Sequence, residues 1–141
     1  MNQKIVYLIV ISMLLACNKN ESSKQTDSFS NAEFFLNKLD AKQQLTKILN
    51  KRNPTEKIRD IQTISYIKSD SSTLAIIFYT TNTGNHNILL EKKPSTQLID
   101  QYSITFCEGY ECTCKVTVSI DNQGKVTTNC SCVYCALVTT Q

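Results

Sequence analysis

The cysteines of this 141-residue chain are concentrated near its C-terminus, where six of the seven lie between positions 107 and 135. Their spacing is C-x4-C-x-C followed by C-x-C-x2-C. So many thiols in so short a stretch are held by disulfide bonds, by a metal ion or as a redox pair, and each solution constrains the chain around it. The compartment in which the protein folds decides among them. The six residues are Cys107, Cys112, Cys114, Cys130, Cys132 and Cys135.

The N-terminal segment indicates export from the cytoplasm. A short start carrying Lys4 is followed by an apolar run from Ile5 to Ala16, which only Ser12 interrupts. This run is shorter than the roughly 20 residues that a membrane-spanning helix needs. A charged start, a short apolar run and a small residue before a cleavage point are typical of a secretory signal peptide. A buried N-terminal strand or helix is the alternative, but the abrupt polarity after Cys17 favours export.

The stretch LLAC at positions 14–17 resembles the lipobox of bacterial lipoproteins, and the resemblance covers residues 1–17 only. It implies that residues 1–16 are a signal peptide that is removed and that the Cys17 thiol carries a diacylglyceryl group. The new α-amine can also be acylated, for example with palmitate. Two or three acyl chains, at about 0.8 kcal/mol per buried methylene, attach a protein durably to a membrane. Asn18 is not the aspartate of the inner-membrane sorting pattern, which favours the outer membrane.

The exported chain divides into a tether and one domain. Residues 17–29 are polar except for Phe29, and we expect them to form a flexible lipid-anchored tether. Residues 30–141 are enough for a single domain with a core and too few for two of ordinary size.

Assigning Cys17 to the anchor leaves an even number of cysteines in an exported chain, which favours three disulfide bonds. Six cysteines allow many connectivities, and the sequence does not choose among them. A Cys-ligated metal is the first alternative, although only Cys132 and Cys135 have the C-x2-C spacing common in zinc sites. A thiol-redox site at the same two residues is the second alternative. Such a site normally precedes a helix that lowers the thiol pKa, and no helix is expected there.

Residues 115–130, inside the Cys-rich hairpin 107–135, predict a tight β-turn between two alternating strands. Gly124 suits the left-handed position of a type I turn with a bulge. The resulting register pairs Ile120 with Val126, Val118 with Thr128, Val116 with Cys130, and Cys114 with Cys132. This register places Cys114 directly opposite Cys132, at a separation that a disulfide accepts.

The first part of the domain predicts a helix. Ser30 and Glu33 match a capping box, and Phe29 and Phe34 match the hydrophobic staple that accompanies it. The helix is expected to end before Pro54, with a second short helix from position 53 to about 61. Its core-facing side is expected to carry Phe35, Leu39, Leu45 and Leu49.

After this helix the pattern is that of a β-meander, with strands expected at 64–67, 73–81, 87–93 and 97–106. The expected fold class is α+β: an N-terminal helix packed on an antiparallel meander, with a C-terminal disulfide-stapled hairpin.

Composition excludes several function classes. The net charge is +3 with the signs interspersed, unlike the basic stripe that nucleic-acid binding requires. The one histidine, His86, is expected to be a solvated turn residue, and Glu108 and Glu111 exposed loop carboxylates. No catalytic residue, cofactor site or phosphate-binding loop is predicted. We therefore expect a non-enzymatic envelope lipoprotein, attached to the membrane through acylated Cys17, that binds an envelope protein or surface ligand on the periplasmic or outer side.

Overall fold

The computed structural model describes residues 28–31, 33–93, 102–110 and 112–141. Residues 1–16, Cys17 and most of the tether lie outside these ranges, as does Glu111. The described chain is mostly antiparallel β with one helix, which confirms the α+β class. Its elements are α2 (Lys38–Arg52), β1 (Ile58–Lys68), β2 (Thr73–Thr81), β3 (Asn85–Lys92), β4 (Ser103–Glu108), β5 (Val116–Ile120), β6 (Val126–Cys130) and β7 (Ala136–Thr140). None of the helical segments within the described ranges is long and apolar enough to span a membrane.

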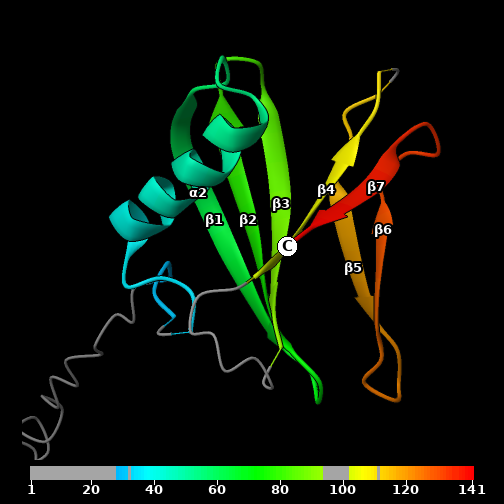
Figure 1. Cartoon of the computed structure of the whole chain (residues 1–141). Helices are drawn as coiled ribbons and strands as arrows, with labels where there is room; N and C mark the ends of the chain where they lie inside the picture. The colour runs from blue at the N-terminus through cyan, green and yellow to red at the C-terminus, as the bar shows by residue number, and fades with distance from the viewer. Residues whose placement is uncertain (1–27, 32, 94–101, 111) are drawn as a thin grey trace, which may run out of the picture.

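The strands form two sheets (Figure 1). The larger has five antiparallel strands in the order β1-β2-β3-β4-β7, and the smaller is the β5-β6 hairpin. Strand β7 returns the chain from the hairpin to the edge of β4, where Phe106 lies opposite Val138. Strand β7 was not predicted from the sequence.

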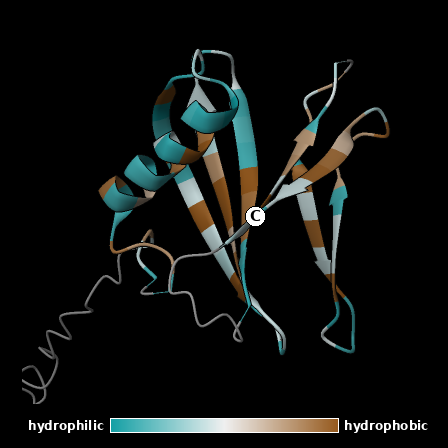
Figure 2. Ribbon diagram, in the orientation of Figure 1, coloured by the Kyte–Doolittle hydropathy of each residue, from teal (hydrophilic) through white to brown (hydrophobic). Residues whose placement is uncertain are grey.

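Two groups of buried apolar side chains lie on opposite faces of the large sheet, because successive residues of a strand point in opposite directions. Ala75 and Ile77 of β2 belong to a cluster that also contains Leu45 and Leu49 of α2. Leu74 and Ile76 of the same strand belong to a second cluster with Val116 of the hairpin. Apolar bands on β1, β2 and β3 in Figure 2 reflect this burial. The large sheet is therefore the middle layer of the domain.

The helix begins later than predicted. Its N-cap is Asn37, whose side-chain oxygen accepts a hydrogen bond from the backbone N–H of Asp40 at 3.0 Å. The capping box at Ser30 is therefore wrong as a helix start. Asn31 instead closes a tight turn, in which its carbonyl accepts from the N–H groups of Phe34 and Phe35.

This later start changes which side chains the helix buries. Phe35 is buried but precedes the helix, and Leu45 and Leu49 are buried as predicted. Leu39 lies in the first turn with 65% of its surface exposed, so its predicted place in the core is wrong. The core position of this turn is taken by Ala41, which is fully buried.

The expected second helix at 53–61 is wrong, because β1 begins at Ile58. The helix ends at Arg52, as predicted, and Asn53 donates its backbone N–H to the carbonyl of Leu49. Pairing with β2, which is continuous from Thr63 to Lys68 and interrupted by two register shifts before it, outweighs the local helical signal.

The other strand predictions are largely confirmed. Strand β2 has the predicted bounds, and β3 begins two residues before the predicted start. Strand β4 covers the end of the segment expected at 97–106, and positions 97–101 lie outside the described residues.

The β5-β6 hairpin has the predicted register, with Val116 opposite Cys130 and Ile120 opposite Val126. Gly124 has a φ of 77°, the left-handed conformation that the turn requires. The side chain of Asp121 accepts hydrogen bonds from the backbone N–H groups of Gln123 and Lys125, both at 2.9 Å. The turn is thus fixed by residues that lie within it.

A buried asparagine joins the hairpin to the large sheet. The Asn87 side chain, 5% exposed, donates to the carbonyl oxygen of Val116 and accepts from the N–H of the same residue, both at 2.8 Å. A primary amide can satisfy a backbone donor and acceptor at once, so the side chain acts as a strand partner for this residue. Val116 thereby enters a buried interface with its peptide groups paired.

Replacing Asn87 with alanine is expected to lower the free energy of unfolding by roughly 2–4 kcal/mol, because two buried backbone groups of Val116 lose their partners. Chemical denaturation followed by circular dichroism measures the change. Asn85→Ala, in the same strand but exposed, is the matched control and should shift stability by under about 0.5 kcal/mol. Equal shifts for the two variants would contradict this role for Asn87.

Candidate functional site

Three disulfides close the C-terminal part of the domain: Cys107–Cys130, Cys112–Cys132 and Cys114–Cys135. Their Cα–Cα distances of 5.7, 6.6 and 5.8 Å are ordinary for disulfides. The prediction that the six cysteines form three bonds is thus confirmed for the described chain. We refer to the segments 107–115 and 130–135, which these bonds link, as the clasp.

The Cys107–Cys130 bond belongs to the folded core. The Cys112–Cys132 and Cys114–Cys135 bonds lie at its edge, and we call them the rim bonds. Cys107 lies in β4, Cys130 ends β6, and Cys107 packs against the cluster that contains Leu74 and Val116. Cys112 and Cys114 lie in the segment between β4 and β5, which has no regular secondary structure in its described part. Their bonds therefore fix the course of this segment.

The bond between Cys114 and Cys132 that the hairpin register would allow does not form. The hairpin pairing does continue past β6, since the Ser131 N–H donates to the Lys115 carbonyl at 2.8 Å and the Ser131 hydroxyl accepts from the Lys115 N–H at 3.0 Å. A turn then follows, in which the N–H of Cys135 donates to the carbonyl of Cys132 at 3.1 Å. This turn brings Cys135 to Cys114, which leaves Cys132 to pair with Cys112.

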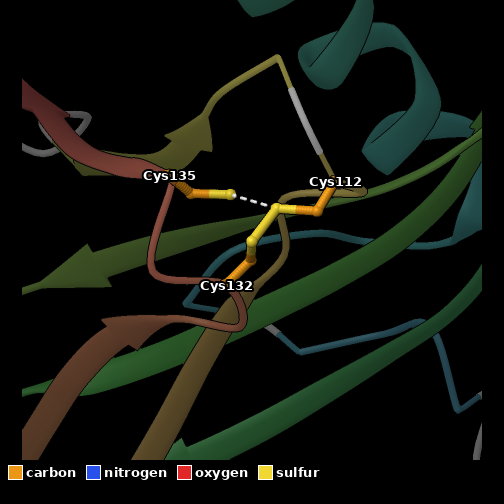
Figure 3. A group of neighbouring side chains, drawn as sticks. All are labelled: Cys112, Cys132 and Cys135. Carbon is orange, nitrogen blue, oxygen red and sulfur yellow. Dashed lines mark hydrogen bonds between the residues drawn. A yellow bond between two sulfur atoms is a disulfide. The ribbon is translucent and has the colours of Figure 1, made fainter.

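Three sulfur atoms, those of Cys112, Cys132 and Cys135, lie within 4.8 Å of one another (Figure 3). This grouping has the dimensions of a thiolate metal site. Each of the three sulfurs is in a disulfide, so none of them is a thiolate in this structure. The C-x-x-C residues Cys132 and Cys135 bond to different partners and not to each other, and strand β7 follows them.

The clasp displays apolar side chains to solvent. Tyr110 is fully exposed, Val133 is 91% exposed and Tyr134 is 67% exposed. The segment of Tyr110 lies against that of Tyr134, because a Cβ on Gly109 would lie 2.7 Å from the Tyr134 carbonyl oxygen and 2.7 Å from the Cys114 sulfur. We call these three side chains the clasp surface.

Arg52, the last residue of α2, connects the helix to β4 beside the clasp. Its guanidinium carbon lies 3.4 Å from the centre of the Phe106 ring, and its Nε donates to a Glu108 carboxylate oxygen at 2.9 Å. Glu108 is exposed, as predicted, but it is an ion-paired residue at the end of strand β4, so its predicted place in a loop is wrong.

His86 is likewise not a solvated turn residue, because it lies in β3 and its ring stacks on Tyr79 at 5.6 Å between centroids. Its Nε2 lies 3.1 Å from the Thr83 hydroxyl and 3.3 Å from a buried oxygen of Glu56. Burial, with the nearby charge of Glu56, raises the pKa of Tyr79 above its usual range. This tyrosine therefore stays neutral, as a member of the core.

The chain has no recognised relative in three comparisons: no protein-family model, no curated protein and no solved structure matches it.

The close packing of Gly109 gives a test of the clasp. Gly109→Ala is expected to lower the free energy of unfolding by roughly 1–3 kcal/mol, because the added methyl overlaps a disulfide sulfur and a backbone carbonyl. Thermal unfolding measures the change. Tyr110→Ala removes a far larger side chain from the same segment, but an exposed one, and should leave the midpoint within a degree or two. If Gly109→Ala unfolds at the same temperature as the wild-type protein, Gly109 is not packed against Cys114 and Tyr134 in this way.

Proposed function

We propose that this protein is a lipid-anchored module of the bacterial cell envelope that binds another envelope protein, without catalysis, through the clasp surface. Two features support the proposal: the lipobox-like stretch that ends at Cys17, and the exposed apolar side chains of the clasp. The exposed apolar side chains are the main support for the binding role.

Exposed tyrosines on a fixed backbone are suited to protein binding. Tyr110 and Tyr134 combine a large apolar ring with a polar hydroxyl, a combination enriched in interfaces. Binding normally requires loops and side chains to become ordered, which costs free energy. Because disulfides constrain both segments beforehand, less of that cost remains at the moment of binding.

The position of the clasp is compatible with an anchor at the other side of the domain. In Figure 1, residues 28–37, where the described chain begins, and the ends of β4 and β6 lie on opposite sides of the view. A tether that enters beside α2 leaves the clasp surface clear of the point of attachment.

The membrane anchor is tested by metabolic labelling with an alkyne analogue of palmitate. The wild-type protein is expected to incorporate the label and to fractionate with membranes, because the acyl chains reside on the residue that follows the cleavage site. Cys17→Ser should abolish labelling, whereas Asn18→Ser, next to it, should keep it. An unlabelled wild-type protein would refute the anchor.

The binding surface is tested by photo-cross-linking in cells. A photoreactive amino acid at position 110 or 133 is expected to give a discrete higher-mass product with a partner protein. Position 123, exposed in the turn at the far end of the β5-β6 hairpin, is the matched control and should give no such product. Equal cross-linking at all three positions, or none at 110 and 133, would contradict a binding role for the clasp surface.

A further inference from the structure

We propose that Cys112 and Cys135 form a disulfide-exchange site, through which the two rim bonds interchange to a second pairing, Cys112–Cys135 and Cys114–Cys132. This inference is independent of the proposed function. It assigns to the clasp a reactivity that a set of purely structural disulfides does not need.

The first observation is a contact between two different disulfides. The Cys112 sulfur lies 3.4 Å from the Cys135 sulfur, the approach drawn as a dashed line in Figure 3. Both atoms are already bonded, Cys112 to Cys132 and Cys135 to Cys114, so this contact joins the two bonds. Exchange requires a thiolate to reach a disulfide sulfur directly, and here the two sulfurs that would bond are already in contact.

The second observation concerns the other two cysteines. Beyond the pair Val116 and Cys130, the backbone of Ser131 remains hydrogen-bonded to that of Lys115, and the Ser131 hydroxyl donates to the Thr113 carbonyl at 3.3 Å. The next pair in this register is Cys114 with Cys132, at a non-hydrogen-bonded position where side chains of opposed residues approach most closely. The first bond of the second pairing therefore joins two sulfurs that are already in contact, and the second joins the residues that adjoin the hydrogen-bonded pair Lys115 and Ser131.

The exchange needs only a catalytic thiolate, supplied by a low-molecular-weight thiol. The thiolate attacks the Cys132 sulfur, forms a mixed disulfide there and releases the Cys112 thiolate. Cys112 attacks the Cys135 sulfur and releases the Cys114 thiolate. Cys114 then attacks Cys132 and expels the original thiolate. Two disulfides are consumed, two are formed, and nothing is oxidised or reduced overall.

The third disulfide stays outside this exchange. The sulfurs of Cys112, Cys132 and Cys135 lie within 4.8 Å of one another, on residues that are only partly buried. Cys107 packs against the cluster beneath the hairpin, and neither it nor Cys130 belongs to the group of neighbouring sulfurs. Cys107–Cys130 therefore holds the hairpin to β4 while the rim bonds interchange.

The exchange is tested on the full-length protein in detergent, incubated anaerobically with glutathione and quenched with acid. We expect a second chromatographic species of unchanged intact mass, which forms only when thiol is present. Fragmentation of the linked peptides should assign it Cys112–Cys135 and Cys114–Cys132. The absence of a second species, or one in which Cys107 or Cys130 has changed partner, would overturn the proposal.

Double variants test the new bonds one at a time by alkylation and intact mass under non-reducing conditions. The C114S/C132S variant retains Cys112 and Cys135 and is expected to close this non-native bond, leaving no thiol to alkylate between positions 107 and 135. The C112S/C135S variant should likewise close Cys114–Cys132. The matched controls, C114S/C135S and C112S/C132S, each keep one native rim bond. Closed controls together with two alkylated thiols in either test variant would refute the geometry on which the exchange depends.

Discussion

The architecture depends on how the hairpin is attached to the large sheet. A two-stranded hairpin is at best marginally stable by itself, and it must bury apolar surface against another element. Here the attachment is Val116, whose side chain packs with Leu74 and Leu89 and whose peptide groups pair with the Asn87 side chain. This combination makes the approach directional, since apolar contact alone would allow the hairpin to slide, whereas the amide pairs with one residue only.

The disulfides extend this attachment toward the rim. Each closes a loop of some twenty residues, with sequence separations of 23, 20 and 21, and bonds of this kind typically contribute about 2–4 kcal/mol each. Most of that contribution comes from restriction of the unfolded chain. The segment between β4 and β5 has few buried side chains of its own, so its order follows from the bonds of Cys112 and Cys114.

Sequence reasoning succeeded where the determining signals are local. The hairpin register could be predicted because Gly124 and Asp121 fix the turn from within it, and every pair then follows by counting. The helix start could not, because Ser30 and Asn37 both precede plausible helical segments and only the tight turn around Asn31 separates them. Asn87 gave no signal, since its partner Val116 is 29 residues away and is bound through backbone atoms.

The disulfide connectivity was out of reach for a related reason. The predicted register correctly placed Val116 opposite Cys130. Counted further, it also placed Cys114 opposite Cys132, but Cys114 bonds to Cys135, three residues later in the chain. A turn between Cys132 and Cys135, followed by the pairing of β7 with β4, draws the chain aside. Strand β7 has only five residues, and their pattern was too weak to predict it from the sequence. When cysteines lie this close together along the chain, small displacements of the backbone select among the possible pairings, and here the turn that leads into β7 decides the bond pattern.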